Sequence, residues 1–158
     1  MTNSTVSKNE KLISKLSEKL FSLLGTQSKG EVSYDKENDL YLLNIDAGDE
    51  AGLLIGKKGD TINSLQILLN QIVRQKTGEW LKIVVDVADF REKEKSRMED
   101  LAAQVAARVR ETEESQNLYN LTPAQRRTVH LFLAEEKDLH TESVGEGESR
   151  YLVVSLNK

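Results

Sequence analysis

The segment 55–59, Ile-Gly-Lys-Lys-Gly, places two glycines three residues apart between two stretches of helical apolar periodicity. Glycine adopts backbone angles that other residues avoid, so this spacing predicts a tight turn between a short helix and a longer one. The N-terminus of the longer helix offers unpaired N–H groups and a positive dipole end, where Lys57 and Lys58 add two charges. Gly56, Lys57, Lys58 and Gly59 therefore suit a phosphodiester backbone, although Gly-x-x-Gly alone is more often a plain turn.

The rest of the N-terminal half alternates helical and strand patterns. Residues 1–9 are polar and predict a disordered N-terminus, whereas residues 10–24 carry apolar side chains at spacings of three and four and predict an amphipathic helix. Residues 31–34 and 40–45 predict a β-hairpin, and residues 80–87 alternate as a strand. The predicted order is helix, two strands, short helix, glycine loop, helix and strand.

The C-terminal half predicts a second small unit built on a long helix. Apolar side chains recur at helical spacing along residues 90–112, a short strand is predicted at 118–121, and a helix begins at Pro123 after the N-cap residue Thr122. Residues 141–144 and 150–156 predict a hairpin around a glycine-containing turn. The fold class is therefore α+β, with a first module over 10–89 and a second over 90–158, in which helix 90–112 is the connector.

Composition narrows the classes of function. The 158 residues contain no cysteine and two histidines, which excludes disulfides and thiolate metal sites and leaves little for other metal binding. No apolar stretch approaches the roughly 20 residues of a membrane-spanning helix, so we expect a protein of the cell interior. A net charge of -4 argues against nucleic-acid binding by bulk positive charge, so any such site must be local. We expect no metal and no cofactor.

Arg126 and His130 stand four residues apart, on one face of the helix that begins at Pro123, with Arg127 beside them. A guanidinium can bind phosphate with two hydrogen bonds, and an imidazole can bond to a base or stack on it. Taken alone, the pair is better interpreted as structural, with His130 satisfied by a neighbour and Arg126 paired with Glu146.

The surrounding sequence favours the functional interpretation. Residues 122–130 (Thr-Pro-Ala-Gln-Arg-Arg-Thr-Val-His), the turn 141–147 (Thr-Glu-Ser-Val-Gly-Glu-Gly) and Arg150 resemble the R-3-H domain, which binds single-stranded nucleic acid. Residues 10–89 resemble a bacterial type II KH domain, whose Gly-x-x-Gly loop clamps about four nucleotides. In this order the two modules resemble the Jag (SpoIIIJ-associated, KhpB-type) family of bacterial RNA-binding proteins.

The resemblance implies a cytoplasmic, non-catalytic protein that binds single-stranded RNA, or single-stranded DNA, and regulates bacterial cell elongation, division and shape. A small single-KH protein is the partner in some members. The nucleic-acid contacts are then expected at Gly56, Lys57, Lys58, Gly59, Arg126, Arg127, His130 and Arg150. Gln125 stands where the pattern commonly has Glu, Leu121 stands where it commonly has Met, and the separate N-terminal domain of many members has no room here.

Two other classes of function stay open. The apolar stripe of the long helix, with Met98, Leu101, Val105 and Val109, could dimerise or dock a partner, which would make the protein a scaffold, but it is more simply the core of the second module. A nuclease with His130 as general base would need an orienting group, for which Glu146 and Arg150 are the only suggestive neighbours. We favour a binding protein with no catalytic residue.

Overall fold

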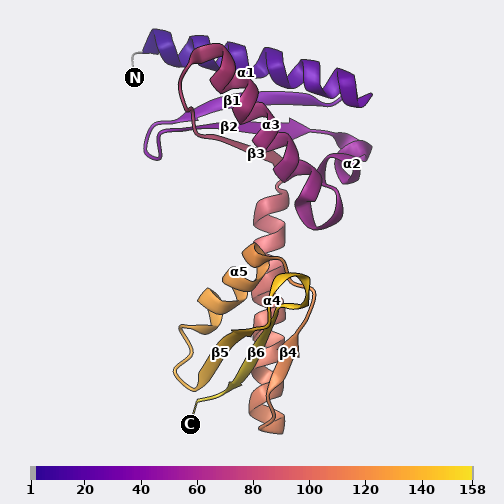
Figure 1. The fold of residues 1–158 in the computed structure, drawn as a ribbon, viewed down its shortest axis with the longest axis vertical. Coiled ribbons are helices and arrows are strands. Elements are labelled where there is room, and N and C mark those ends of the chain that lie inside the picture. Colours follow the sequence, from indigo (N-terminus) through magenta and orange to yellow (C-terminus); the bar gives the residue numbers. More distant parts are fainter. Residues whose placement is uncertain (1–2, 158) are drawn as a thin grey trace. The chain divides into compact units, whose positions relative to one another are not determined.

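The computed structural model describes residues 3–157 and divides into two compact units, the first ending at Arg91 and the second beginning at Glu92. The first unit contains α1 (Asn3–Leu24), β1 (Lys29–Asp35), β2 (Leu40–Asp46), α2 (Ala51–Ile55), α3 (Asp60–Thr77) and β3 (Ile83–Val87) (Figure 1). The long helix α4 (Phe90–Thr112) begins at the boundary. It is followed by β4 (Gln116–Leu118), α5 (Pro123–Leu133), β5 (Leu139–Val144) and β6 (Tyr151–Leu156).

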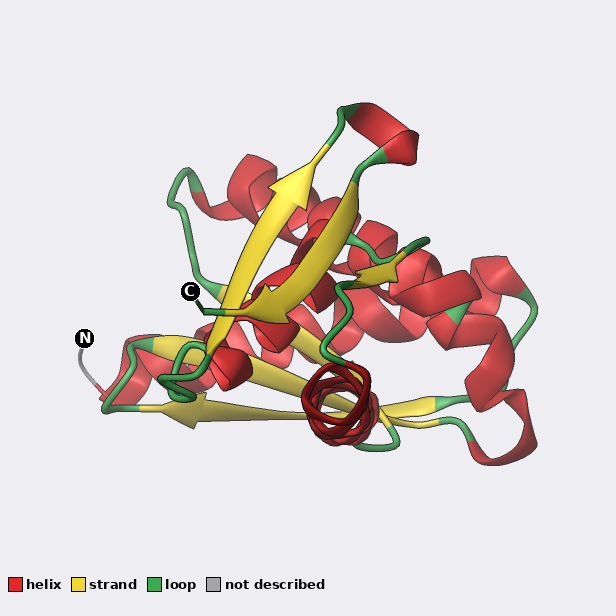
Figure 2. Cartoon of the chain, turned by 90° about the horizontal axis from the view of Figure 1, so that it is seen from below, coloured by secondary structure: helices red, strands yellow, loops and turns green. Residues whose placement is uncertain are grey.

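Both units combine helices with a three-stranded sheet, so the predicted α+β class is confirmed (Figure 2). Single-turn 3-10 segments lie at Gly48–Glu50, Lys57–Gly59 and Gly147–Ser149. No helix within residues 3–157 has both the length and the apolar character needed to cross a membrane.

In the first unit, β2 is the central strand, paired antiparallel with β1 and parallel with β3. Alternate residues of β2 and β3 are buried, so one face of the sheet carries the core. The apolar stripe of α3 and residues Ile13 and Phe21 of α1 pack into the same cluster. This packing fixes α2 and α3, and with them the two ends of the loop that connects these helices.

The first helix is longer than the sequence predicts. It begins at Asn3, so the predicted disorder is wrong for residues 3–9, while residues 1–2 lie outside the described part of the chain. Val6 packs against the core, and buried Asn9 donates from Nδ2 to the hydroxyl of Tyr41 at 3.0 Å. A polar residue on the buried face interrupts the apolar periodicity, and only the tertiary partner reveals that it belongs there.

In the second unit, β6 lies between β4 and β5 in an antiparallel sheet. Leu152 and Val154 of β6 are buried against Met98, Ala102, Ala106 and Val109 of α4 and against Val129 and Leu133 of α5. The stripe of the long helix is therefore the core of this unit. A scaffold that used this stripe for docking would have to expose it.

The short strand of this unit differs in position from the prediction at 118–121. It ends at Leu118 because Asn120 adopts a left-handed backbone angle (φ 59°) and Thr122 already caps α5. Two hydrogen bonds close that cap: Thr122 Oγ1 accepts from the amide N–H of Gln125 at 3.2 Å, and Gln125 Oε1 accepts from that of Thr122 at 2.7 Å. This reciprocal cap fixes where α5 begins.

Candidate nucleic-acid interface

The backbone of the loop between α2 and α3 requires glycine at both ends. Gly56 lies at φ 71° and ψ -172°, a region that is almost exclusive to glycine. A Cβ on Gly56 would lie 2.1 Å from Thr61 Oγ1, and one on Gly59 (φ 85°) would lie 2.8 Å from the ring of Phe90. Lys58 between them is also left-handed, at φ 54°. The two glycines thus shape a turn in which both lysines are exposed.

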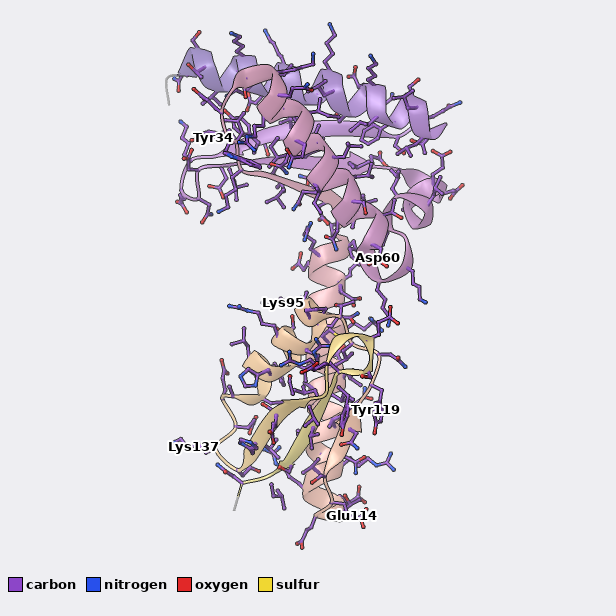
Figure 3. The ribbon with its side chains drawn as sticks, in the orientation of Figure 1. Tyr34, Asp60, Lys95, Glu114, Tyr119 and Lys137 are labelled. Carbon is purple, nitrogen blue, oxygen red and sulfur yellow. The ribbon has the colours of Figure 1, made fainter. Side chains whose placement is uncertain are left out.

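The net positive charge at the loop is smaller than the two lysines alone suggest. The N-cap of α3 has no side-chain hydrogen bond, so the first N–H groups of the helix are not satisfied by a capping side chain. However, Asp60, labelled in Figure 3, is the first residue of α3 and brings a carboxylate to the same end. Two lysines and one aspartate leave the loop with a modest positive charge. Asp60 was not among the residues that the sequence motif singled out.

Apolar and aromatic side chains are exposed on the same unit. Leu53 of α2 is 61% exposed, and Ile55, directly before the loop, is half-buried. On α3, Ile67 is 64% and Leu68 47% exposed. The guanidinium of Arg74 lies 4.1 Å from the ring centre of Trp80. Helical periodicity places Leu68 in the inward stripe of α3, whereas the structure leaves it outside the buried core.

In the second unit, Arg126 holds the backbone together. Its Nη1 donates to the carbonyl oxygen of Leu121 at 2.7 Å and to that of Arg150 at 3.3 Å. No ion pair with Glu146 forms in the structure of residues 3–157. Arg126 therefore joins the start of α5 to the start of β6, and any phosphate would have to use the remaining N–H groups of its guanidinium.

His130 is exposed and contacts the neighbouring strand. Its Nδ1 lies 2.5 Å from Oγ1 of Thr141 in β5, the one hydrogen bond of this ring within the described chain. The orienting partner is thus a hydroxyl and not a carboxylate, which does not support a general base. With Nδ1 engaged, Nε2 is the ring atom that a ligand would meet.

Arg127 and Arg150 are exposed, and within residues 3–157 neither side chain forms an ion pair. Because Arg126 bonds to the backbone of Arg150, the structure brings these three arginines to one end of the unit. Glu146 and Glu148 lie in the adjoining turn and reduce the positive charge there.

A buried polar contact anchors α5 to α4. Gln125 is 5% exposed, and its Nε2 donates to Oε1 of Glu94 at 2.5 Å. Arg97 donates two further hydrogen bonds to this carboxylate, at 3.0 and 2.9 Å, and together with Gln125 lowers the pKa of Glu94. The departure from the pattern at position 125 thus has a structural partner, because an amide can donate to Glu94 and a carboxylate cannot.

Each of the two units matches a known protein family. Residues 11–87 match the family described as KhpA/KhpB, KH domain, and residues 96–156 match the R-3-H domain. The chain therefore joins a KH domain of the KhpA/KhpB family to an R-3-H domain that follows it, as a protein of the KhpB type. The resemblance drawn from the two motifs is thereby confirmed, as is the order of the two domains.

Several members of the KhpB family are similar to this chain. The RNA-binding protein KhpB of Clostridium symbiosum is 31% identical over 141 residues, which cover 89% of this chain and 63% of the relative. Its namesake in Bacillus subtilis (strain 168) is 34% identical over 110 residues, or 68% and 53% of the two chains. That of Lactiplantibacillus plantarum is 32% identical over 128 residues, or 81% and 39%.

The chain thus spans between 39% and 63% of the length of these three curated relatives. All three relatives are named as RNA-binding proteins and not as enzymes, in agreement with the non-catalytic interpretation.

Proposed function

We propose that this protein binds single-stranded RNA through two separate surfaces and performs no catalytic step. On the KH unit the surface is the loop of Gly56, Lys57, Lys58 and Gly59. On the R-3-H unit it comprises Arg126, Arg127, His130 and Arg150. The observation that carries the proposal is the loop, whose two glycines present paired lysines at a helix N-terminus that no side chain caps.

Two weak surfaces on one chain are sufficient for useful affinity. Once one surface has bound a strand, the second meets it at a high effective concentration, so the combined affinity exceeds that of either alone. Each surface contributes a few positive charges. The salt slope is the slope of the logarithm of the affinity against the logarithm of the salt concentration, and each neutralised phosphate of a single strand adds about 0.7 to its magnitude. We therefore expect salt-dependent binding at these two surfaces and no nonspecific binding along the length of a nucleic acid.

The resemblance to the Jag family supports finer expectations. These are a cytoplasmic location, a post-transcriptional role in cell elongation and division, and a small single-KH partner protein.

The test of the loop is fluorescence anisotropy with labelled single-stranded RNA, single-stranded DNA and duplex RNA at several salt concentrations. The variant combines Lys57→Gln with Lys58→Asn, because asparagine tolerates the left-handed backbone at position 58. Loss of two phosphate contacts should weaken RNA binding and reduce the salt slope by about 1.4. The matched control, Lys11→Gln with Lys15→Gln, removes the same charge from α1 of the same unit.

The surface on the R-3-H unit is tested in the same assay with Arg127→Gln and Arg150→Gln, against Arg108→Gln on α4 as control. We expect weaker binding and a smaller salt slope in the double variant only. Unchanged affinity and slope in both the loop variant and this one would refute RNA binding through these surfaces.

A further inference from the structure

Two tyrosines of the R-3-H unit lie against each other, one of them directly after Arg150 in the chain. Tyr119 follows the last residue of β4, and Tyr151 is the first residue of β6, directly after Arg150. Their ring centroids are 4.8 Å apart and their planes are tilted by 37°. Tyr119 is 58% exposed, whereas Tyr151 is half-buried. One side of the Tyr119 ring thus packs on Tyr151, and much of the rest of this ring is exposed to solvent.

The strand register places this pair on the sheet face opposite the core. Leu118 of β4 pairs with Leu152 of β6, and Leu152 is buried under α4 and α5. Because successive side chains of a strand alternate between faces, Tyr151 projects to the other face. Figure 3 labels Tyr119 on the segment that leaves β4. The pair therefore lies where the helices of this unit do not cover the sheet.

Hydrogen bonds restrain the Tyr119 ring and the backbone next to both rings. Asn117 Nδ2 donates to the hydroxyl of Tyr119 at 3.1 Å. The guanidinium of Arg126 binds the carbonyl oxygens of Leu121 and Arg150, which stand two residues after Tyr119 and one before Tyr151. Arg126 thus fixes both segments that carry the rings. An aromatic surface that is already ordered loses little conformational entropy when a ligand stacks on it.

We propose that Tyr119, supported from behind by Tyr151, is a stacking platform for one unpaired base of the strand whose phosphates lie at Arg126, Arg127 and Arg150. This inference rests on the proposed function of the R-3-H unit and adds to it a contact with the base. Bases stack readily on exposed aromatic rings because each base has a π-face, whatever its identity. The platform therefore contributes affinity for single strands without selecting a sequence.

Charge on the same face limits where the strand can run. Glu142 of β5 pairs with Val153, two residues along β6 from Tyr151, and it is exposed. A phosphate would be repelled there, whereas the backbone of Arg150 directly precedes Tyr151 at the start of the strand. The expected ligand is therefore a single strand that places an uncharged planar base over the rings and its anionic backbone toward the arginines. A paired base in a duplex cannot offer its face in this way.

The test uses the full chain carrying Lys57→Gln and Lys58→Asn, so that the loop of the KH unit does not mask the second surface. The variants are Tyr119→Leu, which removes the ring but keeps apolar bulk, and Tyr119→Phe, which keeps the ring and loses the bond from Asn117. The probes are fluorescein-labelled oligouridine and an abasic ribose-phosphate strand of equal length. Thermal unfolding of each variant checks the fold.

We expect Tyr119→Leu to weaken oligouridine binding about 5- to 150-fold, as the loss of one stacked base predicts, with the salt slope unchanged. Tyr119→Phe should stay close to the parent protein, and both variants should bind the abasic strand as the parent does. Equal affinity of Tyr119→Leu and the parent for oligouridine would overturn the platform while RNA binding itself stands. An equal loss on both probes would also overturn it, because the effect would then not involve a base. A parent that binds neither probe, together with a wild-type chain that binds no RNA, would refute the proposed function.

Discussion

Replacing Gln125 by glutamate should destabilise the R-3-H unit, although glutamate is the common residue of the pattern at this position. Gln125 is buried and donates to Glu94 Oε1 at 2.5 Å. A glutamate can still accept from the amide of Thr122, but its second oxygen would face the Glu94 carboxylate. Two charges about 4 Å apart repel by about 4 kcal/mol at an effective dielectric constant of 20. Arg97 offsets part of this, so we expect a net loss of about 2 kcal/mol near pH 7.

The stabilities of the wild-type protein and of Gln125→Glu should depend on pH in opposite directions. In the wild-type protein Arg97 lowers the pKa of Glu94, so the stability from this carboxylate is present above its ordinary pKa and is lost as the pH falls through the lowered value. In Gln125→Glu the two carboxylates share a proton, which raises the pKa of one of them. The variant therefore loses stability as the pH rises through that raised pKa. Its deficit should be large at neutral pH and small near pH 4.

Urea unfolding at these two pH values measures the effect. The matched control is Gln104→Glu, which adds the same charge to an exposed position of α4. The double variant Gln125→Glu with Glu94→Gln exchanges donor and acceptor and should recover most of the loss. If Gln125→Glu and Gln104→Glu unfold at the same urea concentration at neutral pH, the buried contact between positions 94 and 125 does not exist.

Three further variants test local features of the two units. Gly56→Ala should destabilise the KH unit by at least about 2 kcal/mol, because the backbone conformation at this position is nearly exclusive to glycine. Gly52→Ala is the control: it has open space around its Cα in α2 and should be neutral or stabilising. Equal urea midpoints of the two variants would contradict this. Thr122→Ala should cost the R-3-H unit about 1 kcal/mol through loss of the N-cap, more than Thr128→Ala inside the same helix, and thermal unfolding should rank them in that order. Arg110→Gln should lower the melting temperature slightly at low salt and not at high salt, because its ion pairs are exposed; a loss that persists at high salt would indicate a role beyond charge.

Local patterns were sufficient to predict most elements of the fold. The helical stripe of α3 and the cap at Thr122 are short-range features, because a residue meets its partner three or four positions away. The glycine loop is predictable for the same reason, since backbone angles depend on the residue itself. The approximate strand positions follow from alternation, although β4 begins two residues and ends three residues earlier than predicted.

Long-range polar contacts could not be predicted in the same way. Asn9 meets Tyr41 across 32 positions of the chain, and Gln125 meets Glu94 across 31. Neither residue type indicates burial, because most asparagines and glutamines are exposed. The same limit affects Arg126, which the sequence predicts to face phosphate and which in the structure also binds two carbonyl groups. The roles of the candidate site residues themselves stay predictions.

The acidic balance of the chain is compatible with RNA binding because of where its charges lie in the R-3-H unit. Arg150 directly precedes the start of β6, whereas Asp138 receives, through its carbonyl oxygen, a hydrogen bond from the amide of Asn157, just past the end of that strand. Six strand residues span about 20 Å, which exceeds the screening length of roughly 8–10 Å at physiological salt. Acid at the far end therefore acts weakly on a phosphate near Arg150, and Arg110 neutralises part of it. The carboxylates that do oppose binding are Glu146 and Glu148 in the adjoining turn, so the affinity of this surface depends on a local balance and not on the net charge of -4.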